Sequence, residues 1–249
     1  AHDFNIHIGR SSFSRDRLVL DITPDDTDCK QSVQGTVRCS GWSGWPVTLT
    51  SPGVMGPYGF VPFMECNHGI LSMDHGLAGD LAVDGMVTSY EGGRGYCEKD
   101  WGRGFPQGYV WAQSNHFAES GVSLSASVAR IPWLTGSFRG FLIGLLLRGR
   151  LYRFTTYTGA SIERLSVDEW GYRLSVRNRQ FRLAISASRA AGALLPAPYE
   201  RQMVARVAET MTSTVELRLQ CCRSGDILFE GRGGLGCLEV HGDLDSILE

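Results

Sequence analysis

The sequence has no marked excess of either charge, because its 249 residues carry 24 basic and 26 acidic side chains. A chain so close to neutrality has no global field that attracts nucleic acid, so nucleic acid is not an expected partner. Long apolar runs are also missing. The longest, residues 141–147, is interrupted by Gly144 and falls short of the ~20 residues that cross a bilayer. We therefore expect a globular protein whose membrane contact, if any, is peripheral.

Cysteine pairs are missing as well. The seven cysteines are an odd number, none is spaced as CxxC, and the adjacent Cys221 and Cys222 are poorly placed to bond to each other. These features argue for reduced thiols rather than a disulfide framework. The first ten residues, AHDFNIHIGR, contain no basic segment followed by an apolar one, so no signal peptide is predicted. A cytoplasmic location is the resulting expectation.

The dominant pattern of the chain is an alternation of apolar and polar residues, which is typical of half-buried strands. Short connections rich in Gly, Asp, Asn and Arg separate neighbouring stretches, as expected for hairpins. We therefore predict an all-β protein with antiparallel sheets arranged as a barrel or a sandwich. The alternating stretches are VSLSASVAR (122–130), RLYRFTTYTG (150–159), YRLSVRN (172–178), FRLAISAS (181–188), STVELRLQ (213–220) and DILFEG (226–231).

Two further expectations concern organisation. Residues 199–211, YERQMVARVAETM, place Met203, Val207 and Met211 four residues apart, which predicts one short helix near the C-terminus. The chain also changes from motif-rich to plainly alternating near residue 137. We expect a motif-rich barrel region with a cavity at residues 1–136 and a second antiparallel region at residues 137–249.

The first motif-rich stretch, residues 56–77, combines aromatic and ionisable side chains. We predict a strand at 58–65, a tight turn at 66–69 and a second strand at 70–77. Glu65 and His68 then flank the turn, while Asp74 and His75 lie on the second strand and point to opposite faces. At most one of that last pair faces a pocket.

The second motif-rich stretch lies between residues 95 and 117. Glu98 and Asp100 precede a predicted strand, residues 109–117, on which Trp111, Gln113 and Asn115 share one face and His116 lies on the other. Aromatic walls with a few carboxylates suit an extended apolar ligand, or a reaction that develops positive charge on carbon. The neighbouring aromatic residues include Tyr58, Phe63 and Trp101.

Each of these features also has a purely structural interpretation. The carboxylates can be partners of Arg94, Lys99 and Arg103 in ion pairs, and the tryptophans can fill a core. The histidines are more often bonded to backbone than to a metal, and no HExxH spacing is present, so we predict no metal site. The glycine-rich GRGGLG at 231–236 is interpreted as a turn because no helix follows it, and no GxSxG motif is present.

Several long stretches carry a family resemblance. They are GPYGFVPFMECNHGILSMDHGLAG (56–79), GGRGYCEKDWGRGFPQGYVWAQSNHF (92–117), SVARIPWLTGSFRGFL (127–142) and RLYRFTTYTGA (150–160). Together they resemble the tocopherol cyclase family and its bacterial relatives, in register from about residue 4 to the C-terminus. The resemblance implies a lipocalin-like, calycin-type arrangement of antiparallel barrel sheets.

The resemblance also implies an activity. Members of the family close a chromanol ring by adding a phenolic hydroxyl of a prenylated hydroquinone across the nearest double bond of its prenyl tail. This isomerisation needs a proton donor to the alkene, stabilisation of the tertiary cation and a base for the phenol, but no metal or organic cofactor. The expected partner is therefore a hydrophobic small molecule, a prenylated quinol or another isoprenoid.

Two departures and an alternative accompany this resemblance. Family members usually begin with an additional segment bearing an FEGWY-type motif, and this sequence opens after it, so we expect that part of the site is missing or is supplied by a separate piece. The substrate need not be a tocopherol precursor, and hydration of a carotenoid double bond uses the same alkene protonation. A lipocalin-like carrier, which binds such a lipid without changing it, stays open beside the enzyme.

The chemistry places requirements on the acid. An alkene is a very weak base, so its donor must stay protonated at neutral pH, which burial against aromatic rings promotes. The candidates are Glu65, Asp74, Glu98 and Asp100, with His68 or His75 as a histidinium alternative. Glu65 and Asp74 rank higher, because Lys99 and Arg103 adjoin the other two. We expect Trp101 or Trp111 to stabilise the cation, with Tyr58, Phe63, Gln113, Asn115 and His116 completing the binding surface.

Overall fold

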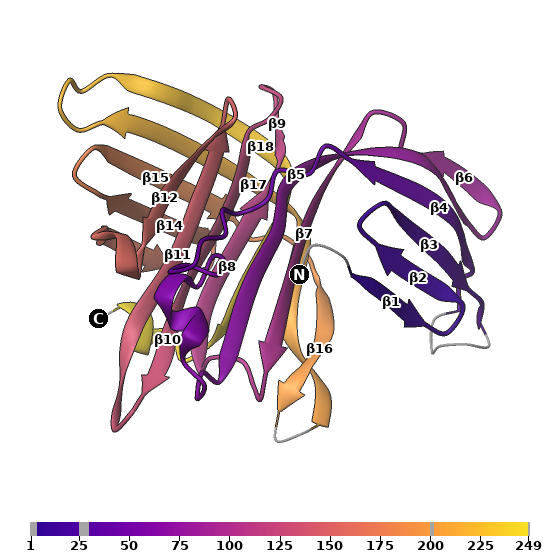
Figure 1. Ribbon diagram of the computed structural model, residues 1–249, viewed down its shortest axis with the longest axis horizontal. Coiled ribbons are helices and arrows are strands. Elements are labelled where there is room, and N and C mark those ends of the chain that lie inside the picture. Colours follow the sequence, from indigo (N-terminus) through magenta and orange to yellow (C-terminus); the bar gives the residue numbers. More distant parts are fainter. Residues whose placement is uncertain (1–3, 25–29, 200–201, 249) are drawn as a thin grey trace. The chain divides into compact units, whose positions relative to one another are not determined.

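The structure is a computed structural model that describes residues 4–24, 30–199 and 202–248. Its strands form two sheets (Figure 1), and all strand pairs whose register is resolved are antiparallel. Two compact units are present: residues 1–44 with 74–97, and residues 45–73 with 98–249. Residue 137, where the sequence predicted a boundary, lies within the strand Gly136–Leu147, which pairs with the strand Ser123–Trp133 inside the second unit.

The first sheet contains seven strands in the order β1-β2-β3-β4-β5-β6, with β7 paired to β5. Strands β5 and β7 are long enough to contribute residues to both units. The bounds are β1 Asn5–Ile8, β2 Ser11–Ser14, β3 Arg17–Ile22, β4 Val33–Ser40, β5 Cys66–Val83, β6 Met86–Ser89 and β7 Gly93–Gly102.

The second sheet has eleven strands and is nearly closed into a barrel. Its order is β12-β11-β10-β8-β18-β17-β15-β14-β13, with β16 paired to β17 and β9 to β18. The bounds are β8 Gly108–Ser114, β9 His116–Phe117, β10 Ser123–Trp133, β11 Gly136–Leu147, β12 Arg150–Thr155, β13 Ser161–Val167, β14 Gly171–Arg177, β15 Phe181–Ser188, β16 Ala193–Tyr199, β17 Gln202–Cys221 and β18 Ile227–Gly242. Helical turns are short: η2 Gly56–Phe60, η3 Thr156–Thr158 and α1 Asp245–Leu248.

The core of the second unit follows from the alternation in its strands. Every second residue points inward, so Val110 and Ala112 of β8 are fully buried, as are Phe154 of β12 and Leu183 of β15. Tyr172 is the largest fully buried side chain. Burying an aliphatic or aromatic side chain stabilises a fold by about 1.5–3 kcal/mol, so this cluster provides a rigid wall for any site on the sheet.

The predicted all-β antiparallel class is confirmed. Each of the six alternating stretches contributes most of its residues to a strand, namely β10, β12, β14, β15, β17 and β18, and the second half of 150–159 forms the 3-10 turn η3 instead. The connections at 148–149, 178–180 and 222–226 join consecutive antiparallel strands as expected.

The helix predicted at residues 199–211 is wrong. Tyr199 ends β16, residues 200 and 201 lie outside the described residues, and the rest belongs to β17. The spacing of Met203, Val207 and Met211 explains the error, because a spacing of four is an even number and fits the period of a strand as well as that of a helix. The one α-helix of the described residues is the four-residue α1.

The hairpin predicted at 58–77 is also wrong. Pro57 lies in the first turn of the 3-10 helix η2, where its fixed φ suits a helical conformation. Strand β5 then runs straight through the predicted turn at 66–69. Gly69 is not a turn residue. A Cβ on Gly69 would lie 3.1 Å from Cζ3 of Trp101, so this glycine allows close packing beside β7.

Candidate active site

A cavity in the second unit is lined by polar and aromatic side chains, several of which come from the two motif-rich stretches of the sequence. Six strands contribute to its wall, together with the segments that precede β5 and β8. The lining residues are Met55, Cys66, His68, Glu98, Asp100, Phe105, Pro106, Tyr109, Trp111, Ser127, Ala129, Ile131, Leu142 and Glu239.

The register of the second sheet places four of these residues in one row. Glu239 of β18 pairs with Trp111 of β8, Trp111 pairs with Ser127 of β10, and Ser127 pairs with Leu142 of β11. Directly paired residues of antiparallel strands share a face, so the row lies on the face opposite to the buried Val110. The predicted orientation of Trp111 is therefore consistent with its place in the cavity wall.

His68 forms a cluster with two carboxylates of β7. Its Nδ1 donates a hydrogen bond to Oδ1 of Asp100 at 2.7 Å, and its Nε2 lies 3.6 Å from Oε2 of Glu98. Burial disfavours the charged imidazole, but the hydrogen bond to Asp100 and the negative charges of Glu98 and Asp100 outweigh it, so the pKa of His68 is raised. His68 thus lies between two carboxyl groups, and the three side chains form one ionisable cluster.

Glu239 and Tyr109 form a second polar pair in the same cavity. The phenol of Tyr109 donates to Oε2 of Glu239 at 2.8 Å. Burial is the main reason that the pKa of Glu239 rises to about 7, and the charges of Glu209, Glu98 and Asp100 raise it further, while the bond from Tyr109 lowers it. The cavity therefore holds a carboxyl group that keeps a proton close to neutral pH.

Aromatic rings and a thiol complete the polar end of the cavity. Phe105 stacks on Tyr109 with 5.9 Å between ring centroids, and Trp111 is buried, with an indole Nε1 that has no hydrogen-bond partner among the described residues. Burial and nearby carboxylates raise the pKa of Cys66 to about 12, so this thiol is neutral. Cys66 therefore does not provide a nucleophile.

An apolar hollow continues from this cavity. The two share Met55, Ser127, Ala129, Ile131 and Leu142. The remaining lining residues of the hollow are mostly aromatic, aliphatic or small, namely Tyr58, Met64, Phe138, Gly140, Phe141 and Thr156. One end of the combined space is thus acidic and aromatic, and the other end is apolar.

Of the predicted site residues, five line these spaces and the others do not. His68, Glu98, Asp100 and Trp111 line the cavity, and Tyr58 lines the apolar hollow. Gln113 is buried on the same face as Trp111, two residues farther along β8, and its Nε2 has no hydrogen-bond partner among the described residues.

Glu65, Trp101 and Phe63 are exposed in the second unit, with Trp101 49% and Phe63 56% accessible. Lys99 lies over the ring of Trp101, with 4.6 Å from Nζ to the ring centroid. Asn115 is buried at the break between β8 and β9, and His116 is exposed on β9.

Asp74 and His75 belong to the first unit and have partners there. Both carboxylate oxygens of Asp74 accept hydrogen bonds from Arg94, and His75 stacks on Trp42 with 4.6 Å between ring centroids. Burial lowers the pKa of His75, so it stays neutral. Asp74 is therefore an ion-pair partner of Arg94, as the structural interpretation of the sequence had it. This pairing removes the reason for ranking Asp74 high as a proton donor.

Sequence reasoning missed Tyr109 and Glu239. Tyr109 was treated only as the start of a strand, although it is two residues before Trp111 and hence on the same face. Glu239 interrupts the apolar stretch GCLEVH of β18, and an acidic residue at that point of a buried strand is the signal that could have found it.

His68, Glu98 and Asp100 are also the described residues that could hold a metal ion, because their ligand atoms lie within 4.8 Å of one another. Nitrogen and carboxylate oxygen donors suit a divalent transition metal. The expectation that the protein needs no metal stays a prediction, which elemental analysis of the purified protein would test.

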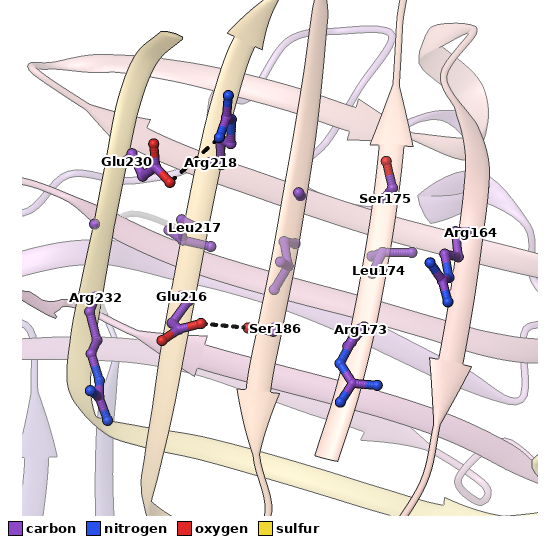
Figure 2. A pocket seen from close by; sticks show the side chains of 13 residues that line it. Arg164, Arg173, Leu174, Ser175, Ser186, Glu216, Leu217, Arg218, Glu230 and Arg232 are labelled. Atoms are coloured by element: carbon purple, nitrogen blue, oxygen red, sulfur yellow. Dashed lines mark hydrogen bonds and ion pairs between the residues drawn. The ribbon is translucent and has the colours of Figure 1, made fainter. Parts of the chain in front are cut away.

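A larger hollow lies on the outward-facing residues of β13, β14, β15, β17 and β18 (Figure 2). Its side chains form polar contacts with one another: Arg218 lies 3.6 Å from Glu230, and Ser186 donates to Glu216 at 3.2 Å. None of the described residues that line it is aromatic. Four arginines line this surface, whereas the cavity described above combines carboxyl groups with aromatic rings.

Comparisons with known proteins identify the family to which the chain belongs. A family profile described as tocopherol cyclase-like matches residues 15–242. A probable chloroplastic tocopherol cyclase of Oryza sativa subsp. japonica is 30% identical over 212 residues, and a chloroplastic tocopherol cyclase of Zea mays is 31% identical over 195 residues. The matches cover 80% and 73% of this chain but 44% and 40% of the relatives, so the chain spans less than half of their length.

Solved structures resemble the chain in fold. The crystal structure of CghA with Sch210972 has a TM-score of 0.55 at 12% identity, and the match covers 94% of this chain and 68% of that chain. The crystal structure of CghA gives a TM-score of 0.53 at 13% identity. Identities this low show a shared fold alone. No helix in the described part of this chain is long and apolar enough to cross a membrane.

Proposed function

The chain belongs to the tocopherol cyclase-like family, and from this premise we propose that it closes a chromanol ring on a prenylated hydroquinone. The reaction adds the phenolic O–H across the nearest double bond of the prenyl tail. The observation that supports this most strongly is the cavity of the second unit, which combines ionisable groups of raised pKa with aromatic rings and opens into an apolar hollow.

The two ends of the space suit the two parts of such a substrate. In this proposal the quinol ring lies at the acidic end, against Trp111 and Phe105, and the tail extends into the hollow lined by Met64 and Phe138. The unpaired indole N–H of Trp111 is a suitable donor to a quinol oxygen, because a buried donor without a partner is costly and gains from a ligand acceptor.

The groups of the cavity also suit the chemistry. An acid protonates the alkene, and the faces of Trp111 and Phe105 stabilise the tertiary cation. The His68–Glu98–Asp100 cluster takes the phenolic proton, because it combines an imidazole with two carboxyl groups. Exclusion of water from the aromatic end protects the cation from hydration. Proton transfer and cation stabilisation of this kind need no resident metal or organic cofactor.

The test is product analysis. Purified protein is incubated with a prenylated hydroquinone under anaerobic conditions, and the products are separated by liquid chromatography with mass detection. We expect a chromanol of unchanged mass that no longer oxidises to a quinone. In D2O the product should gain one carbon-bound deuterium.

Other outcomes would contradict the proposal. A product heavier by one water would indicate a hydratase, and tight binding without conversion would indicate a lipid carrier. A second preparation dialysed against EDTA is expected to turn over at the same rate, and loss of activity that Zn²⁺ or Fe²⁺ restores would assign the His68–Glu98–Asp100 cluster to a metal instead.

A further inference from the structure

Glu239 is one of the residues that line the cavity. It lies on β18 directly opposite Trp111, so its carboxyl group is on the same face as the ring proposed to stabilise the cation. Tyr109 holds Oε2 through a 2.8 Å hydrogen bond, while Oε1 has no hydrogen-bond partner among the described residues. One oxygen is therefore fixed, and the other is free to face a ligand.

The groups around Glu239 favour its neutral form. On β17, Glu209 pairs with Glu239 in register, and two carboxyl groups at paired positions resist simultaneous ionisation. Among the described residues, the basic group that interacts with Glu239 is His68, which is itself shared between Glu98 and Asp100. The titratable groups that face Glu239 are Tyr109 on β8, Glu209 on β17, Cys237 and His241 on β18, His68 on β5, and Glu98 and Asp100 on β7.

We propose that Glu239 is the catalytic acid of this site, with Tyr109 as its positioning residue. The inference deepens the proposed cyclisation and rests on it. It replaces the carboxylates that the sequence ranked highest, because Asp74 is bound to Arg94 in the first unit and Glu65 is exposed.

Every proton in the proposed cyclisation has a source and a destination. The O–H bond at Oε1 of Glu239 breaks and a C–H bond forms at the less substituted alkene carbon, leaving a tertiary cation and a carboxylate. The phenolic oxygen then bonds to the cation, and its proton passes to the His68–Glu98–Asp100 cluster and on to solvent. Glu239 takes a proton from solvent, so the product is an isomer of the substrate and no redox partner is needed.

The deciding experiment compares two amide substitutions on the same strand. Glu239→Gln keeps the shape of the side chain and an oxygen acceptor for Tyr109 but has no transferable proton. Glu230→Gln is the matched control, because Glu230 is exposed on the outward face of β18 beside Arg218 (Figure 2). Turnover is measured as chromanol formed from a prenylated hydroquinone, and affinity as quenching of tryptophan fluorescence by the same compound.

We expect Glu239→Gln to lose at least about 100-fold in kcat with less than about a threefold change in Kd, and Glu230→Gln to match the wild-type protein. Wild-type turnover in Glu239→Gln would overturn the inference while leaving the cyclisation intact. Absence of chromanol from the wild-type protein would instead refute the proposed function.

A second variant keeps the inference testable if Glu239→Gln does not fold. Glu239→Asp retains an acid but withdraws it by one methylene, so we expect partial activity and a displaced alkaline limb in the pH dependence of kcat. An alkaline limb that stays at its wild-type pH in Glu239→Asp would show that another group supplies the proton.

Discussion

The raised pKa of Glu239 has a consequence for stability that requires no substrate. In the unfolded chain this carboxyl ionises near its ordinary pKa of 4.5, whereas burial and the neighbouring carboxylates raise the pKa to about 7 in the folded protein. Between these values the unfolded state binds fewer protons, so the free energy of unfolding falls as the pH rises. The cost is absent well below pH 4.5 and reaches about 3 kcal/mol above pH 7.

Glu239→Gln removes this cost, because the amide is neutral at every pH and still accepts from Tyr109. The free energy of unfolding of the variant, taken relative to that of the wild-type protein, should therefore rise by about 2–3 kcal/mol when the pH is raised from 5 to 8. The assay is urea unfolding at both pH values, followed by tryptophan fluorescence and circular dichroism. Glu230→Gln, on the exposed face of the same strand, should change by less than about 0.5 kcal/mol. A pH-independent difference between Glu239→Gln and wild type would refute a raised pKa at Glu239.

Three other substitutions test separate parts of the structure. Tyr109→Phe removes the bond that lowers the pKa of Glu239, so the alkaline limb of kcat against pH should move up by about one pH unit, and a downward shift would contradict this role. Phe154→Ala should lower the free energy of unfolding by about 3–5 kcal/mol in urea titrations, because Phe154 is fully buried. A loss below about 1 kcal/mol would mean that neighbouring side chains move in to fill the space left by the ring. Arg94→Ala removes the partner of both Asp74 oxygens in a half-buried pair, and should cost about 1–3 kcal/mol, visible as faster amide exchange in β5 and β7; unchanged exchange would assign the pair no stabilising role.

The strands could be predicted because their signal is local. A period of two extends through β10, β14 and β15, and each connection carries its own turn residues, so no distant contact is needed to find them. The failures occurred where two periods coincide or where packing overrides a turn signal. A spacing of four at Met203 and Val207 fits both a helix and a strand, and Gly69 lies beside Trp101 rather than in a turn.

Only part of the candidate site could be predicted from the sequence. His68, Glu98 and Asp100 stand out in sequence because ionisable residues are rare among aromatic ones, and they do come together. Glu239 lies 139 positions after Asp100 along the chain, and only the pairing of β8 with β18 brings it to Trp111. A single sequence does not specify which distant strands pair, so no inspection of residues near the motifs would have reached it.

The separation of the two polar groups along the chain suits the reaction. Adding O–H across a double bond delivers a proton to one carbon and an oxygen to its neighbour, so acid and base must act at different points of the substrate. An acid hydrogen-bonded directly to its base would pass the proton to that base instead of to the substrate. Glu239 lies on β18 and the His68–Glu98–Asp100 cluster on β5 and β7, so the proposed acid and the proposed base are on separate strands. In the proposed reaction Trp111, which pairs with Glu239, lies where positive charge appears once that proton has left.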